Sequence, residues 1–338
     1  MSVPTPLETD DATSAPLPPM SISEVGARAA AVLDEIDLAV VGKRAALEIV
    51  LSAVLAGGHV LLEDFPGLGK TLAARSFAQT LGLEFRRAQF TPDLLPGDLT
   101  GSFIYDQREG EFAFRKGPLF TGLLLADEIN RTPPKTQSAL LEAMQEHQVT
   151  VEGETFALPN PFVVLATANP VEYEGTYPLP EAQLDRFLMR VSFGYPNADE
   201  EDEVLRRRLS RQQEEQTLRA ITDPPTLLAM MRAIETVTVD PSVSRYCVDL
   251  AAATRTHQHI MVGASPRGAL GLLLGARGLA VVRGRDYVIP EDVKAVAHPV
   301  LAHRLTLRPE LWMSSVNSHT VVDAVLGTVA APSARDRV

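Results

Sequence analysis

Short apolar segments alternate with segments of helical spacing as far as about residue 196, and this alternation predicts the fold. The predicted strands are His59–Glu63, Glu84–Gln89, Gly122–Asp127 and Pro161–Ala166. The first, third and fourth are nearly continuous apolar runs, which are typical of parallel strands buried on both faces. Strands that alternate with helices indicate a wound α/β sheet.

The pattern changes around residues 195–199, after which no further buried-strand signal appears. Several of the helices predicted beyond this point follow Pro or Asp-Pro, as expected at helix starts. They are Glu200–Gln216, Pro225–Glu235, Pro241–Thr256, Pro266–Arg283, Pro290–Leu301 and Thr320–Thr328. We therefore expect an α/β domain over residues 21–196 and a smaller all-α domain over residues 197–338. Residues 1–20 are rich in Pro, Ser, Thr and acids, which predicts a disordered arm.

Composition narrows the function classes. The chain has 338 residues, 45% apolar and 22% charged, which is ordinary for a globular protein. Its formal charge of -12 argues against broad non-specific nucleic-acid binding, which needs a basic face. The single cysteine, Cys247, excludes an internal disulfide framework and a multi-cysteine metal site. There is neither a membrane-span-length apolar run nor a signal-peptide pattern, so the expected location is the cytoplasm.

The first predicted strand ends in a loop suited to phosphate. A Pro/Gly turn and then Gly69, Lys70 and Thr71 lead into a helical pattern. Backbone N–H groups of such a loop bind phosphate oxygens at the positive end of a helix dipole. Lys70 would reach the β- and γ-phosphates, and the Thr71 hydroxyl would ligate Mg²⁺. Asp64 stands where the usual pattern has its first glycine, so its carboxylate must point away from the phosphates.

Polar residues also end two later strands. Asp127 and Glu128 follow one apolar run, and Asn169 follows the next. In a P-loop ATPase, Asp127 would hold Mg²⁺ and Glu128 would polarise the attacking water. Asn169 could hydrogen-bond the γ-phosphate or that water. Alone, each of these residues could simply cap a strand or form a turn; their order along the chain favours an ATPase site.

Two arginines complete this series. Arg186 follows a turn region, and Arg267 opens a predicted helix. Either arginine could neutralise phosphate charge, in its own subunit or in a neighbouring one. The alternative for a lone arginine is a surface salt bridge.

Taken in order, these motifs resemble the AAA+ ATPases, and more narrowly the MoxR family. The resemblance covers about residues 22–310. The stretches that carry it are residues 40–43, 62–67, 89–98, 117–120, 127–137, 140–146, 168–170 and 177–187. It implies a parallel sheet with a helical lid, assembly into a ring that is usually a hexamer, and ATP hydrolysis with Mg²⁺ at subunit interfaces.

The resemblance also implies roles for the residues. Asn169 is sensor 1, Arg186 the arginine finger and Arg267 sensor 2, with Glu128 as the catalytic carboxylate and Thr71 and Asp127 at the metal. Arg131 is a rival candidate for the trans-acting arginine. The residues expected to bind nucleotide are Val41, Gly42, Pro66, Gly67, Leu68, Gly69, Lys70, Thr71 and Leu72.

Two segments read as inserted hairpins that could move a client protein or only pack subunits. One spans Ser102–Phe114 within residues 91–118, and the other lies in residues 148–158. The leading hypothesis is a ring ATPase that remodels, assembles or activates a partner. Such partners in the family carry a von Willebrand factor A domain, often for assembly or metal insertion. The alternatives are a nucleic-acid motor, disfavoured by the acidic balance, and a nucleotide-gated scaffold.

Overall fold

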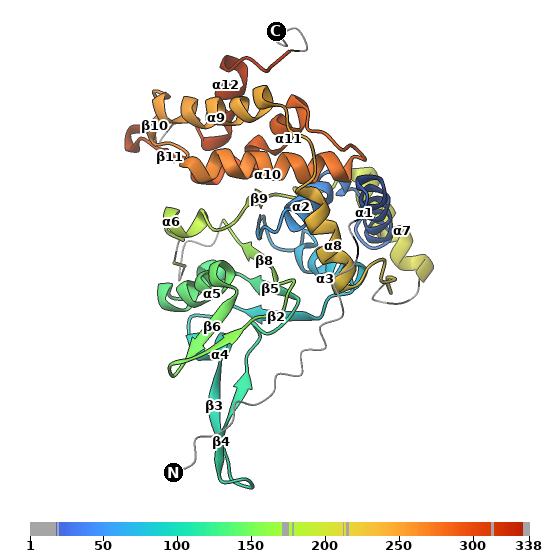
Figure 1. Ribbon diagram of the computed structural model, residues 1–338, viewed down its shortest axis with the longest axis vertical. Helices are drawn as coiled ribbons and strands as arrows, with labels where there is room; N and C mark the ends of the chain where they lie inside the picture. Colours follow the sequence, from blue (N-terminus) through green and yellow to red (C-terminus); the bar gives the residue numbers. More distant parts are fainter. Residues whose placement is uncertain are drawn as a thin grey trace.

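The computed structural model describes residues 18, 20–170, 176–177, 179–211, 213, 216–311 and 314–333. Apart from residues 18 and 20, the arm predicted over residues 1–20 lies outside this range. Figure 1 shows a central sheet with a helical layer on one side and two β-hairpins on the other.

The central sheet has five strands in the order β2-β5-β8-β1-β9, all parallel. The strands are β1 (Val60–Glu63), β2 (Phe85–Gln89), β5 (Leu123–Asp127), β8 (Val163–Ala168) and β9 (Met189–Val191). β5 and β8 are buried along their whole length, which agrees with their continuous apolar sequences. The predicted wound sheet is confirmed. β9 was not predicted, because its three residues are too few to form a recognisable pattern.

Helices cover both faces of the sheet. They are α1 (Ile22–Asp37), α2 (Arg44–Leu55), α3 (Lys70–Leu81), α4 (Pro96–Thr100), α5 (Pro134–Glu146) and α6 (Glu181–Leu184), with a 3₁₀ turn η1 (Ile129–Arg131). α1 starts at a capping box, in which Ser21 and Glu24 satisfy each other's backbone N–H groups. α1, α2 and α3 belong to one apolar core and α5 to a second, on opposite faces of the sheet.

The second part of the chain is helical, as predicted. Its helices are α7 (Ala198–Arg211), α8 (Pro224–Ile234), α9 (Pro241–Thr256), α10 (Pro266–Val282), α11 (Pro290–Leu301) and α12 (Ser318–Thr328), with 3₁₀ turns η2 (Ala302–Arg304) and η3 (Pro309–Leu311). A short antiparallel ribbon, β10 (Ile260–Val262) with β11 (Thr306–Leu307), departs from the all-α expectation. α10 packs on α2, so the first apolar core continues from the sheet domain into the helical second part of the chain, which we call the lid. The domain boundary at residues 196–197 stays a prediction.

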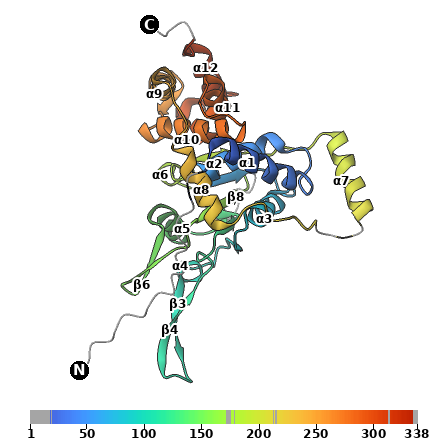
Figure 2. The same cartoon turned by 45° about the vertical axis from the view of Figure 1, so that its right-hand side comes forward.

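Both predicted hairpins are present. β3 (Gly101–Asp106) pairs with β4 (Glu111–Lys116), and β6 (Gln148–Val151) pairs with β7 (Glu154–Ala157). The first projects away from the body in both views (Figures 1 and 2). At the base of this hairpin, a Cβ on Gly101 would clash with the Arg115 carbonyl. A glycine there lets the two strands approach closely. Phe114 stacks on Phe156 with ring centroids 4.0 Å apart, which joins the two hairpins.

Among the helices of the described residues, none has the length and apolar character needed to cross a bilayer.

Candidate active site

The loop between β1 and α3 forms an open cradle. Gly67 and Gly69 have φ angles of 84° and 83°, a left-handed backbone that favours glycine. A Cβ at either position would meet no heavy atom within 4 Å. The space belongs to a cavity of about 400 Å³ at the start of α3. Its lining residues are Pro66, Gly67, Leu68, Gly69, Lys70, Thr71, Leu72, Asp127, Glu128, Thr167, Ala168 and Asn169. We call it the phosphate cavity.

Asp64 does not face this cavity. Its buried carboxylate accepts hydrogen bonds from Ser192 Oγ at 2.6 Å and from the backbone N–H groups of Phe193 at 2.5 Å and Gly194 at 3.3 Å. The residue therefore ties the loop to the chain that follows β9, and its charge is turned away from the place of the phosphates. This contact explains how an aspartate can replace the usual glycine.

Lys70 lies inside the same loop. Its Nζ donates to the carbonyl oxygens of Asp64 and Phe65, the latter at 3.2 Å. Burial lowers the pKa of the Lys70 amine, while the charges of Asp64, Asp127 and other nearby carboxylates act in the opposite direction. The amine is thus partly desolvated and held beside the cradle, where an anionic phosphate would compensate it.

Asp127 lies at the end of β5 with both carboxylate oxygens engaged. Oδ1 accepts from Thr167 Oγ1 at 2.5 Å, and Oδ2 accepts from Arg87 Nη2 at 2.6 Å and Nε at 3.0 Å. Arg87 comes from β2, the edge strand next to β5. One carboxylate, the Thr71 hydroxyl and phosphate oxygens form the hard-oxygen set that Mg²⁺ prefers, so these residues fit that ion.

Hydrogen bonds constrain both the carboxylate and the backbone of Glu128, more than we expect for a carboxylate that acts as a free base. Its backbone is left-handed, with a φ angle of 58°, which is unusual for a residue other than glycine. Its Oε2 accepts from Gln89 Nε2 at 2.6 Å and from Arg131 Nη1 at 2.8 Å. Its backbone N–H donates to Thr167 Oγ1 at 2.8 Å. Thr167 therefore links the two acidic residues and fixes their spacing.

Sequence reasoning missed Arg87, Gln89 and Thr167. A signal existed in β2, because Arg87 and Gln89 make this strand polar where its neighbours are apolar. Only the strand order shows that these side chains lie next to the acidic end of β5. Asn169 lines the phosphate cavity, and its carbonyl accepts a hydrogen bond from Asn130 Nδ2 at 3.1 Å; its contact with the γ-phosphate stays a prediction.

An apolar cavity of about 420 Å³ adjoins the phosphate cavity and shares Gly67, Leu68, Gly69 and Leu72 with it. It lies between the loop before α2, the phosphate loop and α7. Its other lining residues are Ala39, Val40, Val41, Lys43, Pro196, Glu201, Val204 and Leu205. A planar apolar base would fit there. The predicted Val41 lines this cavity, whereas Gly42 lines a neighbouring one beside α11.

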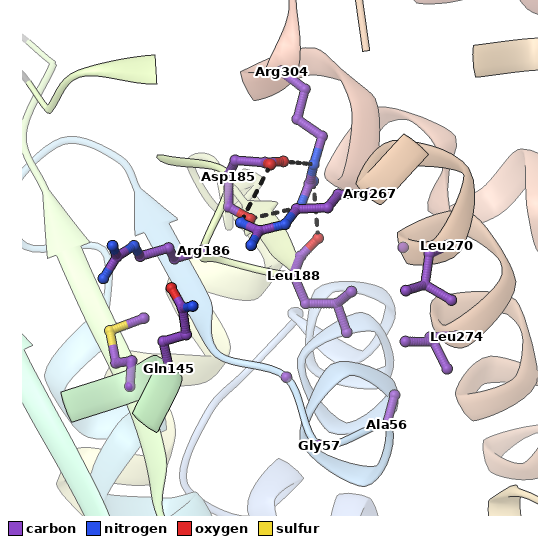
Figure 3. A pocket seen from close by; sticks show the side chains of 13 residues that line it. Ala56, Gly57, Gln145, Asp185, Arg186, Leu188, Arg267, Leu270, Leu274 and Arg304 are labelled. Atoms are coloured by element: carbon purple, nitrogen blue, oxygen red, sulfur yellow. Dashed lines mark hydrogen bonds and ion pairs between the residues drawn. The ribbon is translucent and has the colours of Figure 1, made fainter. Parts of the chain in front are cut away.

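The two predicted arginines lie elsewhere. Arg186 and Arg267 line a separate pocket of about 270 Å³, which Figure 3 shows and which we call the arginine pocket. It shares no lining residue with the phosphate cavity. Gly57 and Gly58, which precede β1, line the arginine pocket, and the loop after β1 lines the phosphate cavity. The two sites therefore lie at opposite ends of β1.

The charges of the arginine pocket are only partly balanced. Arg267 Nη1 lies 3.6 Å from Asp185 Oδ2, and Arg304 Nε lies 2.7 Å from Asp185 Oδ1. Within the described residues no carboxylate forms an ion pair with Arg186, whose side chain lies above Gln145 in Figure 3. The pocket thus offers cationic groups to an anion from outside the chain.

Comparison with known proteins agrees with this arrangement. Residues 59–189 match the ATPase family associated with various cellular activities, and residues 252–325 match the AAA lid domain. The chain is 46% identical to YeaC of Bacillus subtilis, over 90% of this chain and 95% of that protein. It is 44% identical to Chaperone MoxR1 of Mycobacterium tuberculosis, over 88% and 81% respectively. A crystal structure of a Cytophaga hutchinsonii protein superposes with a TM-score of 0.86 at 42% identity, covering 92% of this chain and 97% of that one.

Proposed function

The chain belongs to the MoxR family of AAA+ ATPases, and on that premise we propose that it forms a ring, most simply a hexamer, that hydrolyses ATP between subunits. The ring would work in the cytoplasm to remodel, assemble or activate a partner protein. The observation that carries this proposal is the separation of the arginine pocket from the phosphate cavity. An ATPase site needs both, and adjacent subunits in a ring can bring them together.

Seven residues of the phosphate cavity have roles in the proposed reaction. Backbone N–H groups around Gly67 and Gly69 bind the phosphates, and Lys70 contacts the β- and γ-oxygens. Thr71 and Asp127 would hold a Mg²⁺ ion, which when bound neutralises phosphate charge. Glu128 accepts a proton from the attacking water, and Asn169 orients the γ-phosphate.

The arginine pocket supplies the remaining charge. Arg186 of one subunit would reach the γ-phosphate held by its neighbour, with Arg267 beside it. Arg131 is the weaker candidate for this role, because it pairs with Glu128, which lines the phosphate cavity of the same subunit. An arginine already engaged there serves better to hold Glu128 than to reach another subunit.

We propose that the hairpins contact the partner protein. Three large apolar side chains of β3 and β4 are exposed: Ile104 at 45%, Tyr105 at 51% and Phe112 at 70%. Such a surface suits contact with an apolar protein segment. By the family resemblance, the partner would carry a von Willebrand factor A domain, and metal insertion is one outcome of its remodelling.

The test is ATP turnover per subunit as a function of protein concentration. Wild type should show a rate that rises with concentration, and Arg186→Ala should lower the rate by roughly 10³-fold at every concentration. Arg245→Ala is the matched control, because Arg245 is an exposed α9 arginine paired with Asp249. A concentration-independent rate that is unchanged in Arg186→Ala would contradict hydrolysis at shared sites.

A further inference from the structure

The lid contains a buried arginine, Arg304, that lines the arginine pocket. Arg304 ends the 3₁₀ turn η2 that follows α11, and its side chain is only 5% exposed. Burial lowers the pKa of its guanidinium, and the charge of Asp185 opposes that effect. A buried charge is costly unless it is fully paired, so its partners indicate what it holds in place.

Those partners surround Arg186. The Arg304 guanidinium donates to the Asp185 carboxylate at 2.7 Å, to the Phe187 carbonyl at 2.8 Å and to the Leu188 carbonyl at 3.2 Å. It also donates to the Val300 carbonyl near the end of α11. Figure 3 shows Arg304 reaching across to the segment that carries Arg186.

This segment has little regular structure of its own. Residues 185–188 connect α6 to β9, and Phe187 is fully buried. Carbonyl groups there lie outside helix and sheet, so another donor must satisfy them. The planar fork of an arginine can bond several oxygens at once, which a lysine ammonium on a flexible stem does less precisely.

We propose that Arg304 is a positioning residue that fixes the backbone on both sides of Arg186 and so links the lid to the trans-acting arginine. This inference rests on the proposed role of Arg186 in a neighbouring site. Arg267 of α10 shares Asp185 with Arg304, so two lid arginines meet one carboxylate of the sheet domain. A shift of the lid would therefore move the segment that aims Arg186.

Complementation in mixed rings separates this role from a general loss of structure. The variant is Arg304→Lys, and it is mixed with Glu128→Gln, whose own site is inactive but whose Arg186 is intact. Arg304→Lys alone should lose turnover by roughly 10²-fold, because a misplacement of about 1 Å can have that effect. The mixture should recover turnover at interfaces where a Glu128→Gln subunit supplies Arg186 to an Arg304→Lys site.

Two controls define the readout. Arg308→Lys alters an exposed lid arginine whose Nε donates to the Gln258 carbonyl at 2.9 Å, and it should keep wild-type turnover. Binding of a fluorescent ATP analogue by Arg304→Lys should match wild type, because the phosphate cavity is untouched. Asp185→Asn removes the negative charge that Arg304 and Arg267 share, and it should reproduce a smaller loss with the same recovery.

Three outcomes would overturn the proposal. Turnover unchanged in Arg304→Lys would mean that Arg304 does not position Arg186. Loss that the Glu128→Gln subunit cannot restore, while a mixture of Arg186→Ala with Glu128→Gln does recover, would place the defect in the variant's own site. Failure of the Arg186→Ala mixture itself would instead contradict hydrolysis at shared sites, and the role of Arg304 would fail with it.

Discussion

The phosphate cavity and the arginine pocket lie at opposite ends of one strand and differ in how their charges are balanced. In the phosphate cavity both carboxylates are paired, Asp127 with Arg87 and Glu128 with Gln89 and Arg131. In the arginine pocket a single carboxylate, Asp185, faces several guanidinium groups. In the phosphate cavity each carboxylate therefore has its own cationic or polar partner, whereas guanidinium groups outnumber carboxylates in the arginine pocket. This difference supports the proposal that one subunit contributes halves to two different sites.

Besides Arg186→Ala, the variant with the largest expected effect on this comparison is Glu128→Gln. The change removes the proposed base and leaves the hydrogen-bonding shape, so turnover should fall by roughly 10²–10³-fold while ATP still binds. Single-turnover hydrolysis and binding of a fluorescent ATP analogue would separate the two quantities. Glu109→Gln, an acid in the exposed β3–β4 turn, is the matched control. Equal loss of binding and turnover would show that Glu128 contributes to the cradle rather than to the chemistry.

The next prediction concerns the pH dependence of stability and rests on His59, which directly precedes β1 on the side of the arginine pocket. His59 is buried, and burial lowers the pKa of its imidazole from 6.5 to about 4. The Val164 N–H donates to Nδ1 at 3.0 Å, and Nε2 faces the Met144 carbonyl at 3.1 Å, so the neutral ring satisfies both neighbours. Met144 also lines the arginine pocket.

Because the unfolded chain binds this proton more readily, the stability contribution of neutral His59 is fully present above about pH 6.5 and is lost as the pH falls toward about 4. The loss over that window is of order 3 kcal/mol of unfolding free energy. Urea unfolding at a series of pH values would measure it. His59→Gln should flatten the dependence; an equally steep curve in that variant would assign the effect to other groups.

The smallest expected effect is on the free energy of unfolding and concerns Asp64 in the loop between β1 and α3. Asp64→Gly restores the usual glycine of the motif, yet it leaves the Ser192 hydroxyl and the Phe193 N–H without their acceptor. We expect the free energy of unfolding to fall by about 2 kcal/mol, with no gain in ATP affinity. Thermal unfolding and nucleotide titration would measure both quantities. Asp223→Gly, at the exposed N-cap of α8, provides a comparison of similar chemistry. Tighter ATP binding in Asp64→Gly would show that the carboxylate does repel phosphate.

The central sheet and the acidic strand ends could be predicted because both leave local patterns. Continuous apolar runs mark β5 and β8, and the polar residues that follow them must meet at one edge of a parallel sheet. β9, β10 and β11 escaped prediction because runs of two or three residues carry no period. The family membership was also within reach, since long motifs such as residues 127–137 carry it.

The separation of the arginines from the cavity could not be predicted in the same way. Arg186 and Arg267 appear in the expected order along the chain, and order alone does not say which end of the sheet they occupy. Arg304 was beyond sequence reasoning, because it contacts Asp185 from 119 residues away and lies in no recognisable motif. Such contacts depend on how α11 and η2 pack against β9, which is a property of the folded molecule.

The β3–β4 hairpin can be considered as a lever arm. Its six-residue strands extend roughly 20 Å at about 3.4 Å per residue, from a base where the chains meet at Gly101 and Gly117. A rotation of about 10° at that base would carry the tip through roughly 3.5 Å, close to the length of one extended residue. If the hairpin holds a client as proposed, a small angular change in the sheet domain would be enough to advance an extended client segment by one residue.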